Sequence, residues 1–295
     1  METINRCPLC NSSEFNPHQE VKDYTASNEV FQIVACKNCR FLITNPRPSA
    51  VEISKYYQSD KYISHTGGGK SLFDRIYLFA RNFSLQWKHD TVARYQEPGS
   101  LLDFGCGTGE FLNRCQKHGW KVSGVEPSDD ARAKATQLIG KHMAATISEL
   151  PETKYDAITL WHVLEHVHAL ADTLQTITGQ LKTGGTIFIA VPNYQSPDGG
   201  HYQAHWAGYD VPRHLWHFST ETMTALLKKV GLKIVEIKPM KLDAFYVSLL
   251  SEGYRNPNKP KWLAATTAFI RGLRSNVAAA KTTNHSSLIY IAKHA

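Results

Sequence analysis

Short apolar runs alternate with amphipathic segments from residue 100 to the C-terminus. This pattern predicts strands at 101–104, 121–125, 155–160, 186–191, 232–237 and 287–292. Helices are predicted at 110–118, 128–138, 220–230 and from 163 onward. Ser128 is expected to cap the second of these helices and Gly231 to end the helix at 220–230. The alternation favours an α/β, Rossmann-like architecture, with a mostly parallel sheet and helices on both faces.

The first 48 residues contain four of the six cysteines, arranged as two CxxC pairs. These residues are Cys7, Cys10, Cys36 and Cys39. Each pair lets two thiolates bind one ion from a tight turn, and two pairs complete the tetrahedron that zinc prefers. We expect a structural zinc ribbon at 1–48. The alternative is a redox-active or metal-free set of thiols.

A glycine-rich turn lies between the predicted strand at 101–104 and the helix that follows, in the sequence LLDFGCGTGEFL. Glycines let backbone approach a ligand closely, and a helix N-terminus supplies free N–H donors. The spacing of Gly105, Gly107 and Gly109 differs from the GxGxxG spacing of dinucleotide sites. Asp103 and Glu126 end the first two strands, where carboxylates contact the cationic part and the ribose of a nucleotide-like ligand.

This arrangement resembles the class I S-adenosylmethionine-dependent methyltransferases over about residues 100–238, with 287–292 as the family's last, antiparallel strand. The resemblance implies a seven-stranded sheet and S-adenosylmethionine as the cofactor. It assigns cofactor binding to Asp103, Gly105, Cys106, Gly107, Glu126, Ile147, Ser148 and Trp161. The alternatives are an NAD-binding Rossmann domain and a fold that has lost its cofactor.

The segment WHVLEHV at 161–167 follows the strand at 155–160. If a helix begins near His162, then His162, Glu165 and His166 share one face. The segment resembles the VLEHV stretch of ubiquinone-biosynthesis O-methyltransferases, some of which bind a divalent ion through Glu, Glu-His and a distant His. That resemblance makes His162, Glu165, His166 and His214 candidate catalytic residues, with His217 as an alternative distant partner.

Three interpretations of this segment stay open. The first is a divalent-ion site, with magnesium as the candidate, that lowers the pKa of an acceptor hydroxyl. The second is a histidine general base, and the third is a purely structural contact. Six aromatic residues are candidates for an acceptor pocket or for plain packing: Tyr57, Tyr62, Trp161, Tyr194, Trp206 and Trp216.

The net charge of +7 is concentrated at the C-terminus, where residues 255–295 contain seven Lys or Arg and no Asp or Glu. Within this stretch, apolar residues recur at helical spacing from Trp262 to Val277, among basic residues. We therefore expect a basic amphipathic helix within an insertion at about 243–285. It lies either on a membrane surface or against the domain or a second subunit.

Together these features predict a zinc ribbon at 1–48, a helical linker or lid at 49–98 and a methyltransferase domain at 99–295. The expected reaction is methyl transfer to a small-molecule oxygen, of quinol, phenol, lipid or sugar type. RNA methylation is an alternative, but residues 159–162 read TLWH rather than the Asn/Asp-Pro-Pro-Tyr/Phe motif of base-amine methylation. A non-enzymatic adaptor is a further alternative, disfavoured by the intact glycine turn. The absence of a long apolar run and of an N-terminal apolar signal region predicts a cytoplasmic protein.

Overall fold

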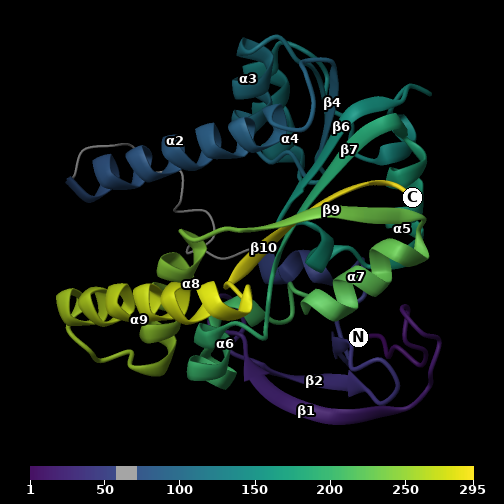
Figure 1. The fold of residues 1–295 in the computed structure, drawn as a ribbon. Coiled ribbons are helices and arrows are strands. Elements are labelled where there is room, and N and C mark those ends of the chain that lie inside the picture. The colour runs from purple at the N-terminus through teal and green to yellow at the C-terminus, as the bar shows by residue number, and fades with distance from the viewer. Residues whose placement is uncertain (58–71) are drawn as a thin grey trace.

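The computed structural model describes residues 1–57 and 72–295. Its centre is a six-stranded sheet in the order β5-β4-β6-β7-β10-β9 (Figure 1). The strands are β4 (Ser100–Phe104), β5 (Lys121–Val125), β6 (Tyr155–Trp161), β7 (Leu181–Pro192), β9 (Leu232–Pro239) and β10 (Ser287–His294). β5, β4, β6 and β7 pair in parallel, whereas β10 is antiparallel to both β7 and β9. The Rossmann-like fold and its antiparallel last strand are therefore confirmed.

The expectation of a seven-stranded sheet is wrong for the described residues, which form six strands in this sheet. A single parallel bridge between Val125 and Ala144 takes the place of the seventh strand beside β5. The chain enters the short 3-10 helix η3 (Ile147–Glu149) directly afterwards. The segment is therefore too short to extend the ladder.

Helices cover both faces of this sheet (Figure 1). One face carries α2 (Leu72–Ala93), α3 (Glu110–Lys117) and α4 (Asp129–Ile139), and the other carries α5 (Leu170–Gly179) and α7 (Thr220–Lys229). Side chains alternate along each strand. For example, Leu101 and Leu102 are both fully buried but belong to different core clusters, one on each face. As expected, Ser128 caps α4, and Gly231 follows α7 with a positive φ.

One local expectation is wrong. The helix expected from Val163 is a 3-10 turn, η4 (Leu164–His166), and α5 begins only at Leu170. The reason is that His162 has a left-handed backbone, with φ of 58°, and its N–H donates to the Ala190 carbonyl of β7 at 3.0 Å.

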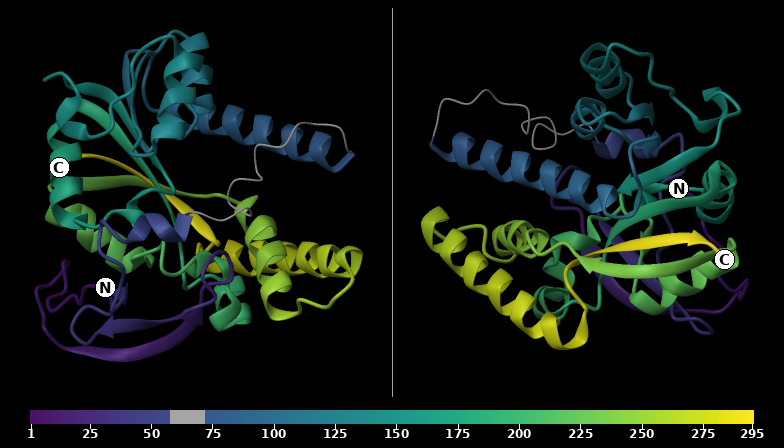
Figure 2. Two further views of the ribbon diagram at one scale, coloured as in Figure 1. Left: turned by 180° about the vertical axis from the view of Figure 1, so that it is seen from behind. Right: turned by 45° about the horizontal axis from the view of Figure 1, so that its top comes forward.

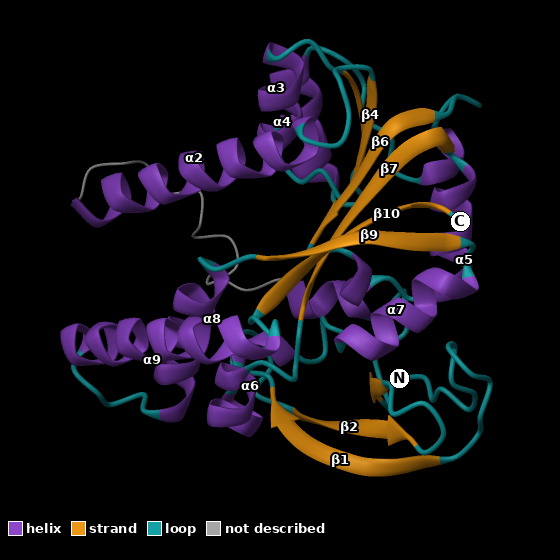
Figure 3. Ribbon diagram, in the orientation of Figure 1, coloured by secondary structure: helices purple, strands orange, loops and turns teal. Residues whose placement is uncertain are grey.

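A second sheet, which is antiparallel, has the order β1-β2-β3-β8, and Figure 3 shows β1 and β2 below the central sheet. Its strands are β1 (Phe15–Lys22), β2 (Val30–Cys36), β3 (Leu42–Thr44) and β8 (Trp216–His217). Since β8 comes from the C-terminal part of the chain, backbone pairing joins the predicted ribbon to the larger domain. The 3-10 helix η1 (Ile53–Tyr57) follows this sheet.

The insertion near the C-terminus is a pair of packed helices, α8 (Asp243–Arg255) and α9 (Lys261–Thr282). They pack beside α6 (Pro197–Tyr202) and the 3-10 helices η5 (Gln203–His205) and η6 (Ala207–Tyr209). Small residues on α9 let the two helices approach closely, because a Cβ at Gly272 would lie 2.8 Å from Phe245 Cδ1. Within residues 1–57 and 72–295, no helix combines the length and apolar character needed to cross a bilayer.

Candidate functional site

The turn between β4 and α3 requires glycine for two different reasons. Gly105, Gly107 and Gly109 all have a positive φ, of 78°, 54° and 84°. A Cβ at Gly105 would clash with Val163 Cγ2 at 2.4 Å, so packing demands glycine there. A Cβ at Gly107 would meet no atom within 4 Å. Gly107 therefore faces open space, as a backbone that receives a ligand must.

Two carboxylates flank this turn, because β4 and β5 are parallel neighbours and both end at the same edge. Asp103 is 2% exposed and accepts a hydrogen bond from Thr159 Oγ1 at 2.6 Å. Burial raises the pKa of Asp103 to about 7, although Thr159 and the Lys88 charge oppose this shift. Glu126 accepts hydrogen bonds from the backbone N–H groups of Gly107 and Ser128, each at 2.9 Å. The carboxylate of Glu126 is thereby fixed against the turn.

The remaining cofactor candidates surround the same edge. Trp161 ends β6, its ring meets Phe111 edge-to-face, and its indole N–H has no partner among the described residues. Lys88 Nζ lies 4.9 Å from the centroid of the Trp161 ring. Ile147 and Ser148 belong to η3, which follows the bridge beside β5.

Cys106 uses its backbone N–H within the protein, donating to Val125 O at 3.0 Å. Its side chain is buried in the core beneath the turn. Lys88 belongs to no motif, so the sequence did not indicate it as a site residue. It nevertheless provides a positive charge close to Asp103.

His162 lies between two acids. Its Nε2 is 3.0 Å from Asp243 Oδ2, and its Nδ1 is 3.3 Å from Glu165 Oε1. Burial alone would lower the pKa of His162, but the two carboxylates outweigh it and raise the pKa to about 9. The imidazole therefore carries both protons at neutral pH, which argues against His162 as a general base.

Glu165 also forms a cluster with His166 and His214, in which the potential ligand atoms lie within 4.8 Å of one another. His166 Nδ1 lies 3.0 Å from the Arg213 carbonyl oxygen, and His214 Nδ1 lies 2.9 Å from that of Gly208. Because a carbonyl oxygen only accepts, Nδ1 is the protonated nitrogen of each ring in its neutral form, and Nε2 then has a lone pair. Tyr57 Oη, 2.9 Å from His166 Nδ1, accepts from the same N–H.

Metal-ligating histidines are normally oriented in this way by carbonyl acceptors. Glu165 is 1% exposed, and apart from the 3.3 Å contact between Oε1 and His162 Nδ1 its carboxylate oxygens have no hydrogen-bond partner among the described residues. A buried carboxylate of this kind needs a neighbouring cation. His162 provides a positive charge next to Oε1, whereas Oε2 has no such neighbour in the described part of the chain. The three residues thus fit a divalent ion, whereas His217 lies outside the cluster and contacts Thr44 Oγ1 at 2.9 Å.

The sequence matches the family described as a methyltransferase domain over residues 76–237, which is more than half of the 295-residue chain. The chain belongs to this methyltransferase family.

The methyltransferase is similar to two ubiquinone biosynthesis O-methyltransferases. The ubiquinone biosynthesis O-methyltransferase of Rhizobium etli is 32% identical over 101 residues, which cover 32% of this chain and 41% of that protein. The human mitochondrial ubiquinone biosynthesis O-methyltransferase is 28% identical over 164 residues, covering 49% of this chain and 44% of that protein. The methyltransferase thus spans less than half the length of these curated relatives.

A solved structure supports the fold of the methyltransferase. The magnesium protoporphyrin IX methyltransferase of Synechocystis PCC 6803, solved with bound SAH, superposes with a TM-score of 0.53 at 14% identity. The similarity covers 82% of this chain and 98% of that one. It therefore extends beyond the segment that matches the family, to most of the molecule.

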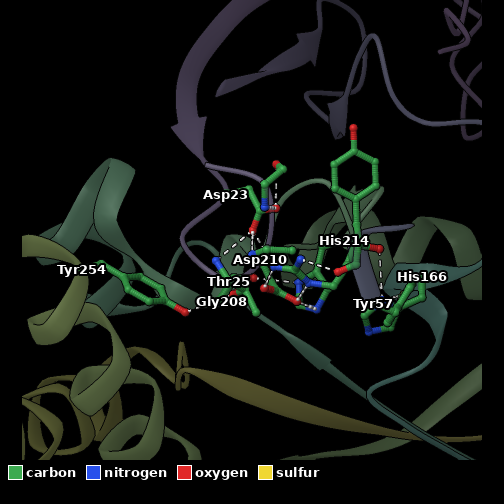
Figure 4. A network of polar contacts seen from close by, with 12 residues as sticks. Asp23, Thr25, Tyr57, His166, Gly208, Asp210, His214 and Tyr254 are labelled. Carbon is green, nitrogen blue, oxygen red and sulfur yellow. Dashed lines mark hydrogen bonds and ion pairs between the residues drawn. The ribbon is translucent and has the colours of Figure 1, made fainter. Parts of the chain in front are cut away.

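A buried polar network joins the N-terminal sheet of the methyltransferase to its histidine cluster (Figure 4). Arg213 is 1% exposed and pairs with Asp23 at 3.1 Å and with Asp210 at 2.6 Å. Tyr57 Oη lies 2.9 Å from His166 Nδ1. The loop after β1 therefore lies beside the cluster, a placement that the sequence did not reveal.

The aromatic candidates divide between site and core. Tyr57 and Trp161 lie at the site as described above. Trp206 and Trp216 are buried, and their indole N–H groups donate to Asp198 and to the Val167 carbonyl, so both serve packing. Tyr194 is half-buried and packs edge-to-face with His18. Tyr62 lies outside the described residues.

The four N-terminal cysteines of the methyltransferase converge, with sulfur atoms within 4.8 Å of one another. Two identical turns present them. Asn11 N–H donates to the Cys7 carbonyl at 2.8 Å, and Arg40 N–H donates to that of Cys36 at 2.9 Å. Asn11 and Arg40 share a left-handed backbone, with φ near 60°. The geometry fits the tetrahedral set expected for zinc.

Proposed function

We propose that this protein transfers a methyl group from S-adenosylmethionine to an oxygen atom of a small molecule, of quinol, phenol, lipid or sugar type. The observation that carries the proposal is the glycine turn facing open space at Gly107, flanked by Asp103 and Glu126. The relatives named for ubiquinone biosynthesis O-methylation support oxygen as the acceptor atom.

The cofactor supplies an electrophilic methyl group on a sulfonium, so the protein must bind, align and exclude water. Glu126 would accept hydrogen bonds from ribose hydroxyls, as acids after the second strand do. Asp103 would neutralise the ammonium group of the methionine moiety. Lys88 offers the matching positive charge for the carboxylate of that moiety.

On the acceptor side, we propose that Glu165, His166 and His214 bind a divalent ion. A bound ion lowers the pKa of a coordinated hydroxyl and so prepares an oxygen nucleophile. Two imidazoles and one carboxylate suit a transition ion such as Zn²⁺ or Mn²⁺ better than Mg²⁺, which prefers oxygen ligands. If no ion binds, the lone pair on His166 Nε2 is the alternative acceptor for the hydroxyl proton.

The cysteine centre has a separate role in this proposal. A closed set of four thiolates leaves no open coordination position, so a zinc ion at Cys7, Cys10, Cys36 and Cys39 would be structural. Its contribution would be to hold β1–β3 against β8 and thus to position the loop that carries Asp23.

The test is a methyl-transfer assay with labelled S-adenosylmethionine and a panel of phenols, quinols, sugars and lipids. It is run after chelation and again after adding Mn²⁺, Zn²⁺ or Mg²⁺. We expect transfer to at least one hydroxyl acceptor, reduced about tenfold or more by Glu126→Gln. Glu152→Gln, an exposed carboxylate outside the site, is the matched control. Absence of both cofactor binding and transfer would refute the proposal.

A further inference from the structure

The outward face of α9 is apolar although nothing in the described structure covers it. Trp262, Phe269, Leu273 and Val277 recur at helical spacing and are 72%, 60%, 50% and 63% exposed. The helix docks instead through small residues on another face: Ala268, Gly272, Ser275 and Ala279. α9 therefore does dock on the domain, as one of the two alternatives had it, but through these small residues, and the apolar stripe stays exposed. Figure 2 shows α9 along the outside of the molecule.

The charge around this stripe is of one sign. Arg274 and Lys281 border it, and residues 255–295 contain no acidic residue at all. A shallow groove of about 490 Å³ on the same helix is lined by Leu273, Arg274, Val277, Ala278, Lys281 and Thr282. Apolar and basic groups thus alternate within one concave surface. Contiguous exposed apolar surface of this kind marks an interaction site.

We propose that this face of α9 binds the surface of an anionic lipid bilayer. An interfacial helix has Trp and Phe on one side, flanked by Lys and Arg. The aromatic rings enter the boundary between headgroups and acyl chains, while the cations contact lipid phosphates. A second copy of the chain fits less well, since a two-fold interface would bring the same basic residues together.

The position of the helix pair connects this surface to the candidate site. α8 begins at Asp243, whose carboxylate lies 3.0 Å from His162 Nε2 beside the proposed metal ligands. α8 also packs against α9. A lipid surface bound by α9 would therefore be linked to the candidate site through α8, and we expect a lipid-borne hydroxyl as the acceptor. This last step rests on the proposed function, whereas binding to the bilayer does not.

The experiment is co-sedimentation of the full chain with vesicles of phosphatidylcholine alone and of phosphatidylcholine with added phosphatidylglycerol. We expect binding only when the anionic lipid is present, and weakening with salt. Replacing both Arg274 and Lys281 by Gln should weaken binding about 25-fold, at about fivefold for each charge removed. Phe269→Ser with Val277→Ser should also weaken binding.

The matched controls are Lys134→Gln for the charge and Val235→Ser for the exposed apolar residue, since both residues are exposed on other elements. Neither should change vesicle binding. Equal binding to both kinds of vesicle, or no effect of the α9 variants, would overturn the proposal. So would α9 variants that abolish a dimer in sedimentation without affecting vesicles, because the face would then bind a second copy.

Titration of the same α9 variants with S-adenosylmethionine separates the two proposals. Cofactor affinity is expected to stay unchanged in these variants, because α9 holds none of the proposed cofactor ligands. Vesicle binding without cofactor binding would leave the α9 proposal intact and refute the proposed function. The opposite result would refute the α9 proposal alone.

Discussion

Replacing Asp103 by asparagine should stabilise the protein without cofactor and weaken its binding of S-adenosylmethionine. The carboxylate is 2% exposed, and its pKa is raised from 3.8 to about 7 by burial. A pKa raised in the folded state means that the folded protein binds the proton more tightly than the unfolded chain does. The stability contributed by this proton is complete below pH 3.8 and is lost as the pH rises through about 7.

The magnitude follows from the shift. Moving the pKa from 3.8 to about 7 costs about 4 kcal/mol once the group is ionised, at about 1.4 kcal/mol per pKa unit. Asparagine keeps the shape and can still accept from Thr159, but it does not ionise. Relative to the wild type, the free energy of unfolding of Asp103→Asn should therefore rise by up to about 4 kcal/mol between pH 4 and pH 8.

Cofactor affinity should change in the opposite direction. If Asp103 pairs with the ammonium group of S-adenosylmethionine, losing a charged hydrogen bond weakens binding about 10- to 100-fold at pH 8. In the wild type, affinity should fall as the pH drops below about 7, since protonation removes the same charge. The variant should lack this pH dependence.

Urea unfolding at a series of pH values, with and without S-adenosylmethionine, measures both effects. Asp172→Asn, an exposed carboxylate on α5, is the control and should shift neither stability nor affinity. The reasoning is refuted if the stability difference between Asp103→Asn and the wild type does not depend on pH. It is equally refuted if cofactor affinity is the same in both.

Three further predictions concern the other centres. Arg213→Met should lower the free energy of unfolding by about 3–5 kcal/mol, because Asp23 and Asp210 lose their buried partner; an unchanged urea midpoint would contradict this. Cys36→Ser should abolish the zinc content measured by elemental analysis and destabilise the N-terminal sheet. A wild-type protein that contains no zinc would contradict this. Glu165→Gln should remove ion-dependent transfer while leaving affinity for S-adenosylmethionine within about twofold, and retained activity with the same ion requirement would exclude the metal site.

Local sequence pattern was sufficient for the central sheet and the glycine turn. Buried strands such as β4 and β6 are short apolar runs, and the left-handed backbone at Gly105 and Gly107 favours glycine. The segment after β6 could not be predicted in the same way. A hydrogen bond from His162 to Ala190, 28 positions away in the chain, holds the backbone out of a helix that the side-chain spacing favours.

The partners of the site also depend on contacts across the chain. Asp243 meets His162 from a helix 81 residues later, and Lys88 meets Trp161 from a helix that precedes the glycine turn. Neither residue belongs to a motif. The sequence likewise identified the apolar stripe of α9 but not its orientation, because the small residues that dock the helix leave the stripe exposed.

Calorimetric titration with S-adenosylhomocysteine tests most directly whether the turn at Gly107 binds the cofactor. Gly107→Ala and Gly140→Ala form a matched pair, since both glycines have a positive φ and neither added Cβ would meet an atom within 4 Å. The account predicts saturable binding to the wild type, unchanged in Gly140→Ala and at least about tenfold weaker in Gly107→Ala. No binding to the wild type, or equal affinity in the two variants, would contradict it.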